Sequence, residues 1–173
     1  MALREKTGAG VMDCKKALAE AEGDFDKAME IIRKKGQLVA AKRSDREASE
    51  GCVLAGVKDG FAAIVALKCE TDFVAKNADF IAFTKSILDK ALEVLPETID
   101  ELKEQVVGGR KIADLLTDQM GKIGEKIDVG FYGKVSAEHS FAYTHPGNRL
   151  ATIVSFDAKV ADPQVGKDVA MQI

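Results

Sequence analysis

Few residues in this chain could do chemistry, and their spacing does not bring them together. The two histidines, His139 and His145, have no cysteine or acidic residue at the spacing of a metal site. The three cysteines, Cys14, Cys52 and Cys69, form no CxxC pair, and their odd number argues against a disulfide framework. We therefore expect no metal centre, and we expect the thiols to be reduced, as in a cytoplasm.

Neither a nucleophile nor a general base has a partner group. Cys14 lies between Asp13 and Lys15, and a neighbouring lysine can activate a thiol. No histidine is close in sequence to act as its base, so a structural cysteine is the favoured interpretation. Asp72 or Glu70 could act as a general base, but neither has a second catalytic group at a recognisable spacing. These observations predict that the protein is not an enzyme.

Two glycine-containing segments could contact phosphate, but neither forms an established phosphate-binding motif. Gly8 and Gly10 make a GxG without a preceding strand or a third glycine, and the chain has no GxxxxGK[ST] loop. Residues 108–111, Gly-Gly-Arg-Lys, are better explained as a turn between two helices. We therefore expect no cofactor and no direct nucleotide binding.

Composition and charge narrow the possible partners. The net charge is -3, which is not the basic balance of a nucleic-acid binder. No apolar stretch approaches the roughly 18 to 20 residues of a membrane span, and the N-terminus lacks the apolar core of a signal peptide. We therefore expect a cytoplasmic protein without a membrane partner. One basic cluster could touch RNA, but no aromatic residue is interleaved to stack on bases: Arg33, Lys34, Lys35, Lys42, Arg43 and Arg46.

The first 36 residues predict a small domain of three short helices. Asp24 is a suitable N-cap for the third helix, and Gly36 fits the position just past its end. We predict this domain at residues 1–36, followed by a polar linker at 37–50 that is partly helical at 38–42. The helices are expected at residues 3–6, 11–20 and 25–34, and the third carries Phe25, Ala28, Met29 and Ile32 on one face.

From Gly51 onward the apolar pattern changes from helical to extended. Residues 52–58 and 61–68 have strand length and flank Asp59 and Gly60, a pair that favours a tight β-hairpin. This mixture of extended and helical segments predicts an α+β domain over residues 51–173, with antiparallel strands covered by helices. Further helices are expected at 79–94, after Thr98, at 110–122 and at 164–173, and further strands at 127–135, 140–144 and 150–156.

One motif lies directly after the second predicted strand. It reads Thr71-Asp72-Phe73-Val74-Ala75-Lys76-Asn77. Thr71 or Asp72 could simply cap the next helix and Phe73 could be a core residue, which is the interpretation that spacing alone favours. If Phe73 is instead exposed, the hairpin and the helix would hold it rigidly. It would then be a preorganised aromatic anchor for another protein.

This motif, TDFVAKN after a hairpin, resembles the signature of the bacterial elongation factor Ts family. Residues 4–18, REKTGAGVMDCKKAL, resemble the N-terminal signature of the same family, and residues 168–173 resemble the helix after its first core subdomain. The motifs occur in the family's order, and the resemblance covers essentially the whole chain. It implies a three-helix head similar to ubiquitin-associated domains, followed by a core subdomain of the dimerisation type.

The resemblance also implies a function and a set of contact residues. Proteins of this family are guanine-nucleotide exchange factors that bind the GTPase elongation factor Tu and release its GDP during translation elongation. Phe73, positioned by Asp72, would wedge between two helices of the partner's GTPase domain, near its magnesium and nucleotide. The head would pack on the same domain, and the turn at His145 would approach the partner's third domain. The implied contact residues are Thr71, Asp72, Phe73, Val74, Arg4, Val11, Met12 and His145.

The sequence departs from the family pattern at three places. After Met1 the chain starts at Ala2-Leu3-Arg4, so we expect the first helical turns that are usual in the family to be missing or rebuilt. Position 11 is Val where the family commonly has Met. The chain stops at Ile173, within a helix that still carries apolar residues, so we expect a fragment whose core subdomain is incomplete. Exposed apolar surface on such a fragment could lead two copies to form a homodimer. Two alternative functions remain open: a ubiquitin-associated-like adaptor without exchange activity, and a ribosome- or RNA-binding protein that uses residues 33–46.

Overall fold

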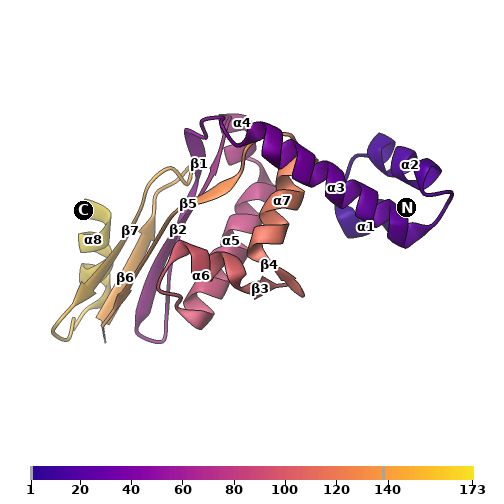
Figure 1. The fold of residues 1–173 in the computed structure, drawn as a ribbon. Coiled ribbons are helices and arrows are strands. Elements are labelled where there is room, and N and C mark those ends of the chain that lie inside the picture. The colour runs from indigo at the N-terminus through magenta and orange to yellow at the C-terminus, as the bar shows by residue number, and fades with distance from the viewer. Residues whose placement is uncertain (1, 138) are drawn as a thin grey trace. The chain divides into compact units, whose positions relative to one another are not determined.

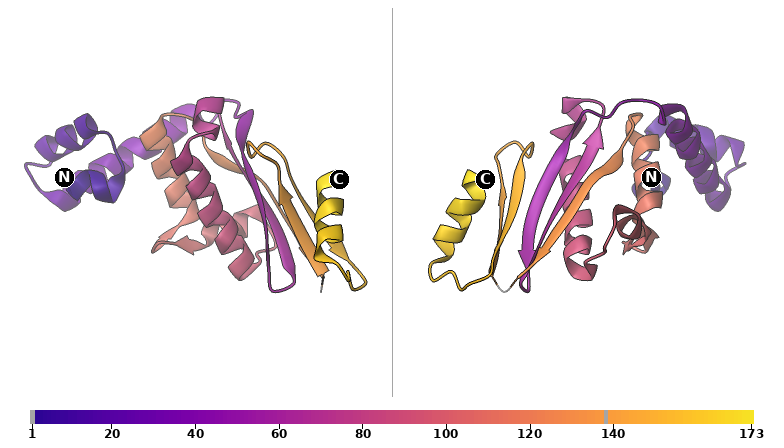
Figure 2. Two further views of the ribbon diagram at one scale, coloured as in Figure 1. Left: turned by 180° about the vertical axis from the view of Figure 1, so that it is seen from behind. Right: turned by 60° about the vertical axis from the view of Figure 1, so that its left-hand side comes forward.

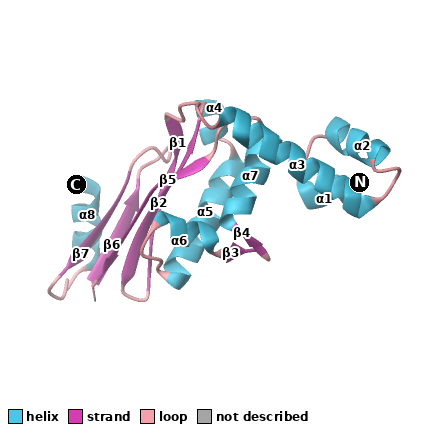
Figure 3. Ribbon diagram, in the orientation of Figure 1, coloured by secondary structure: helices cyan, strands magenta, loops and turns pink. Residues whose placement is uncertain are grey.

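The computed structural model describes residues 2–137 and 139–173, and the chain divides into two compact units. The first unit runs up to Glu47 and also takes in Ala113–Ile127. The second unit consists of Ala48–Ile112 and Asp128–Ile173. Figures 1 and 3 show that the first unit is helical and that the strands lie in the second. The division into residues 1–36, 37–50 and 51–173 stays a prediction.

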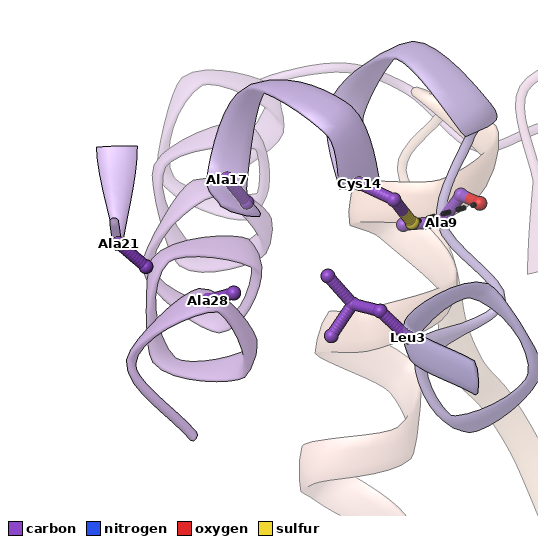
Figure 4. Packing of buried hydrophobic residues seen from close by; sticks show 6 residues of the cluster. All are labelled: Leu3, Ala9, Cys14, Ala17, Ala21 and Ala28. Carbon is purple, nitrogen blue, oxygen red and sulfur yellow. Dashed lines mark hydrogen bonds between the residues drawn. The ribbon is translucent and has the colours of Figure 1, made fainter. Parts of the chain in front are cut away.

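The first unit contains the predicted N-terminal helices, and small side chains fill its core. Helices α1 (Ala2–Thr7), α2 (Val11–Glu20) and α3 (Phe25–Arg43) pack around this core, where alanines let the helices approach closely. The face predicted for the third helix is confirmed, because Ala28 is buried and Phe25, Met29 and Ile32 pack beside it. Figure 4 shows the buried cluster: Leu3, Ala9, Cys14, Ala17, Ala21 and Ala28.

Helix α3 is longer than the sequence predicted. Its start is confirmed, since the Asp24 carboxylate accepts hydrogen bonds from the backbone N–H groups of residues 26 and 27 at 3.0 Å. The predicted end at Lys34 is wrong, because the helix continues through Gly36 to Arg43 and includes residues 37–43 of the predicted linker. Gly36 is a packing residue: a Cβ added at Gly121 of α7 (Ile112–Ile123) would lie 2.7 Å from the Gly36 Cα.

The second unit is built on the predicted hairpin. Strands β1 (Glu50–Lys58) and β2 (Phe61–Cys69) pair antiparallel, and β5 (Asp128–Ser136) pairs with the other edge of β2. The backbone φ angles of Asp59 and Gly60 are 50° and 83°, as a type I′ turn requires. Strands β6 (His139–Thr144) and β7 (Ala151–Phe156) form a separate two-stranded sheet.

Helices and strands cover the two faces of this three-stranded sheet. Helix α5 (Ala78–Val94) packs on one face, with the ring of Phe80 and the side chains of Ile87 and Leu88 buried. Strands β6 and β7, with α8 (Pro163–Gln172), lie on the other side, as Figure 2 shows. The predicted α+β class is therefore confirmed.

The segment after α5 contains one wrong prediction. Helix α6 (Ile99–Glu104) is capped by Thr98, whose hydroxyl accepts a hydrogen bond from the N–H of Glu101 at 3.1 Å, as predicted. Gly108 and Gly109 do not join two helices. They form the turn between strands β3 (Val106–Val107) and β4 (Arg110–Lys111), because their φ angles of 59° and 82° fit a hairpin turn. Helix α7 therefore begins at Ile112 rather than at Arg110.

Candidate functional site

The TDFV motif forms a tight corner between a strand and a helix. We call residues 71–74 the 71–74 corner. Strand β2 ends at Cys69, and one helical turn, α4 (Asp72–Ala75), follows Thr71. The N–H of Ala75 donates to the Thr71 carbonyl at 3.2 Å, which closes this turn. The side chain of Asn77 then caps α5 by accepting from the N–H of residue 79 at 2.8 Å. The corner is thus fixed by a paired strand before it and a capped helix after it.

Phe73 points away from the core at this corner. Its side chain is 84% exposed, whereas Phe80, seven residues further on, is 2% exposed. Ala75 faces inward and is buried, and Val74 is half-buried. The interpretation of Phe73 as a core residue, which spacing alone favoured, is therefore wrong. An exposed aromatic ring on a fixed backbone loses little conformational freedom when another protein binds it.

Asp72 is held in its ionised form at the surface. The Lys76 ammonium group lies 2.7 Å from the Asp72 carboxylate, across one turn. The hydrogen bond from the Lys76 side chain, together with the lysine's charge, lowers the pKa of the Asp72 carboxyl, and the charge of Arg149 lowers it further. A carboxylate whose pKa is lowered is a weaker base, so the ion pair with Lys76 does not favour Asp72 as a general base.

The predicted contact residues of the head lie on the surface of the first unit. Arg4 is exposed on α1, and Val11 and Met12 are 40% and 64% exposed on the first turn of α2. Cys14 faces the opposite way: its thiol is buried and donates to the Ala9 carbonyl at 3.7 Å. The structural interpretation of Cys14 therefore fits its surroundings, and α2 presents two apolar side chains to solvent.

The turn at His145 belongs to the same compact unit as the 71–74 corner. His145 is exposed, and its Nδ1 lies 2.8 Å from the Tyr143 hydroxyl. The N–H of Asn148 donates to the His145 carbonyl at 3.0 Å and closes the turn. The Asn148 carbonyl in turn accepts from the N–H of Val53 on β1 at 2.8 Å. This last bond attaches the turn to the strand that pairs with β2.

Sequence reasoning missed a groove beside this turn. The groove has a volume of about 270 Å³ and draws its lining from three strands and the turn, so no single segment reveals it. The sequence shows only two of its lining residues as glycines, Gly51 and Gly130. In the structure, a Cβ at Gly51 would lie 2.5 Å from the Leu67 carbonyl oxygen, and a Cβ at Gly130 would collide with the Lys68 side chain. The lining residues are Ser49–Val53, Ala66–Lys68, Gly130, Phe131, Asn148 and Arg149.

The described residues offer little that would support other site classes. Within residues 2–137 and 139–173, no group of three or more His, Cys, Asp and Glu side chains could hold a metal ion. In the same part of the chain, no helix is both long and apolar enough to cross a membrane. The most distinctive feature of the described residues is the exposed aromatic ring of Phe73 on a rigid corner. Such an exposed aromatic anchor favours a protein-binding module as the class of this protein.

Comparison with known proteins identifies the family. The sequence model described as "Elongation factor TS" matches residues 70–173. Elongation factor Ts of Porphyromonas gingivalis is 58% identical over 172 residues, and that of Azobacteroides pseudotrichonymphae is 55% identical over 171 residues. Each alignment covers 99% of this chain and 62% of the relative. The protein belongs to the elongation factor Ts family, and the chain spans about 62% of the length of these two relatives.

Longer relatives also match nearly the whole of this chain, which again spans only part of their length. Elongation factor Ts of Bacteroides fragilis is 55% identical over 172 residues, and the alignment covers 99% of this chain but 52% of the relative. The resemblance deduced from TDFVAKN and REKTGAGVMDCKKAL is thus confirmed at the level of the family. The roles of the individual contact residues remain predictions.

Proposed function

We propose that this chain binds elongation factor Tu and promotes release of its GDP, as a guanine-nucleotide exchange factor that makes and breaks no covalent bond. The observation that carries the proposal is the 84% exposure of Phe73 on a corner held between β2 and α5. Membership of the elongation factor Ts family supports it, because such a factor acts in translation elongation. Translation takes place in the cytoplasm, where we place the protein.

The corner would act as a wedge. Phe73 would insert between two helices of the partner's GTPase domain, with Thr71, Asp72 and Val74 fixing its direction. A wedge near the nucleotide would disturb the bound magnesium ion, which is one of the largest local charges holding the phosphates. Aromatic anchors of this kind supply much of the binding energy at protein interfaces.

Exchange follows from a difference in affinity between two states of the partner. The factor must bind nucleotide-free partner more tightly than GDP-bound partner. Each 1.4 kcal/mol of that preference weakens GDP binding about tenfold, and GDP weakens the factor's binding by the same ratio. The chain therefore needs no nucleotide site of its own.

Further contacts would come from the head and from the β6–β7 turn. Val11 and Met12 present apolar side chains on the first turn of α2, and Arg4 adds a positive charge on α1. His145 would approach the partner's third domain. RNA binding is the less favoured function, because acidic side chains offset part of the positive charge of the basic cluster: Lys34 pairs with Glu30, and Lys35 pairs with Asp13.

The proposal is tested by the release of a fluorescent GDP analogue from elongation factor Tu. The wild-type chain should accelerate release, and Phe73→Ala should reduce the acceleration by about thirtyfold, which corresponds to roughly 2 kcal/mol for an interface hot spot. Val57→Ala is the matched control. Val57 is also an exposed apolar side chain of the second unit, but it lies at the turn end of the hairpin, away from the corner.

Three outcomes separate the alternatives. Equal release by wild type and Phe73→Ala would refute the wedge. Binding to nucleotide-free partner without faster release would refute exchange by this chain and would fit an adaptor. If the chain does not bind the partner but binds RNA in a salt-sensitive way, the RNA-binding function would replace the proposal.

A further inference from the structure

The turn between α1 and α2 of the first unit is covered by a side chain from α7. A Cβ placed on Gly8 would lie 3.3 Å from Cδ, 3.5 Å from Cε and 3.6 Å from Nζ of Lys122, so the outer part of this lysine side chain runs alongside the glycine. The preceding residue of α7, Gly121, lies against Gly36 of α3. Two consecutive residues of α7 thus reach two different elements of the same unit.

The turn has hydrogen bonds of its own, but it also contains two glycines. The N–H of Gly8 donates to the Arg4 carbonyl at 2.7 Å, and the Cys14 thiol donates to the Ala9 carbonyl at 3.7 Å. Helix α2 begins after Gly10 without a side-chain hydrogen bond to cap it. Because glycine has the widest choice of backbone angles, a side chain that covers this turn restricts the part of it that varies most easily.

A lysine is suited to this position. Lys122 is exposed as a residue, but a lysine can lay its apolar stem on a surface while its ammonium group stays in water. Gly8 has a φ angle of 67°, in the left-handed region typical of the residue that ends a helix. A side chain at Gly8 would be strained at this angle and would also meet Lys122. The glycine therefore leaves room for the lysine stem.

This turn separates the predicted contact residues of the first unit. Arg4 lies on α1 before the turn, and Val11 and Met12 lie on the first turn of α2 after it. The backbone of residues 8–10 therefore sets the direction of Arg4 relative to the two apolar side chains. We propose that Lys122 is a positioning residue, which holds this turn and so presents the three contact residues together to elongation factor Tu. The role toward the partner rests on the proposed exchange function.

The first measurement does not need the partner. Amide hydrogen exchange, followed by NMR in the whole chain, reports how often the bond from the Gly8 N–H to the Arg4 carbonyl opens. Lys122→Ala should raise the exchange rate of this amide about fourfold, the equivalent of about one methylene group taken out of contact. Lys122→Met keeps an unbranched stem without the charge, so its rate should stay near that of wild type.

Two controls show whether the effect is local. Lys34→Ala removes an exposed lysine from α3 of the same unit and should leave the Gly8 amide unchanged. The amide of Ala28, which is buried in the core of this unit, should exchange at the same rate in every variant. An unchanged Gly8 rate in Lys122→Ala would overturn the inference. An equal rise in Lys122→Met would contradict a role of the stem.

The second measurement is a double-mutant cycle in binding to nucleotide-free elongation factor Tu. Lys122→Ala should raise the dissociation constant about threefold, below the range of a hot spot, because no direct contact is removed. In the background of Met12→Ala the same change should cost less, since one of the side chains that it positions is then missing. Fully additive losses would mean that Lys122 acts independently of Met12 and would contradict the proposal.

The two measurements separate failure of the inference from failure of the function. If wild type neither binds elongation factor Tu nor accelerates GDP release, the proposed function fails, and hydrogen exchange alone decides whether Lys122 holds the turn. Faster exchange of the Gly8 amide in Lys122→Ala would then support the inference about the turn, and an unchanged rate would overturn it. If wild type binds and the cycle shows coupling, both the positioning role and the contact surface are supported.

Discussion

At the scale of single residues, two phenylalanines show how position on the backbone decides a side chain's role. Phe73 and Phe80 are seven residues apart, at the start of neighbouring helices, yet one is 84% exposed and the other 2% exposed. Burial of Phe80 removes apolar surface from water and stabilises the second unit. Exposure of Phe73 contributes nothing comparable to folding, which leaves the ring available to a partner.

This contrast makes a prediction about stability. Phe73→Ala should change the free energy of unfolding by no more than about 0.5 kcal/mol, as is usual for surface positions. Phe80→Ala should lower it by about 3–5 kcal/mol, because it leaves a cavity between α5 and the sheet. Urea denaturation followed by circular dichroism measures both variants. A loss of several kcal/mol in Phe73→Ala would mean that the ring is part of the core and would contradict its role as a wedge.

At the scale of elements, the packing of α3 on α7 depends on two glycines. Gly36 is buried in the middle of α3, where its helix propensity is poor, and Gly121 of α7 lies against it. The missing side chains let the two backbones approach. Tertiary packing therefore overrides local propensity, and α3 continues to Arg43 instead of ending near the glycine.

Gly121→Ala should destabilise the protein although alanine favours helices. The propensity gain is about 1 kcal/mol, but the added Cβ would lie 2.7 Å from the Gly36 Cα, so a backbone must move. We expect a net loss of about 1–3 kcal/mol in thermal or urea unfolding. Gly36→Ala is the graded control and should lose less, because its Cβ would lie 3.3 Å from the Thr117 carbonyl oxygen. A stabilised Gly121→Ala variant would show that the helices do not pack this closely.

At the scale of the whole molecule, the candidate contacts are divided between the two compact units. Arg4, Val11 and Met12 belong to the first unit, whereas the 71–74 corner and His145 belong to the second. A partner that touches both units would gain from two sites joined by one chain. In the proposed exchange function, the free energy of this combined binding would weaken the partner's binding of GDP.

Linkage gives a prediction at this scale. The dissociation constant of the chain from elongation factor Tu should rise as GDP is added, and the chain should weaken GDP binding by the same factor. Surface-immobilised partner titrated with the chain at several GDP concentrations measures the first quantity. Equilibrium titration of fluorescent GDP at several concentrations of the chain measures the second. If the two factors are both close to one, the chain binds without acting on the nucleotide.

The sequence alone determined the local structure wherever short-range chemistry is strong. Asp59 and Gly60 specified the hairpin because both accept positive φ, Asp24 and Thr98 specified helix starts through their caps, and the apolar period identified α5. The TDFVAKN motif also identified the family. These features depend on neighbours within a few residues, which a sequence displays directly.

Only the tertiary structure decided the features that depend on distant segments. Phe73 could have been core or surface from its spacing, and its exposure follows from how β2 and α5 enter and leave the corner. The continuation of α3 past Gly36 depends on its packing against Gly121, which lies 85 positions further along the sequence. The contact of Arg149 with Glu50 joins residues 99 positions apart. Such contacts form only when the chain folds, because packing and burial, rather than local propensity, bring these residues together.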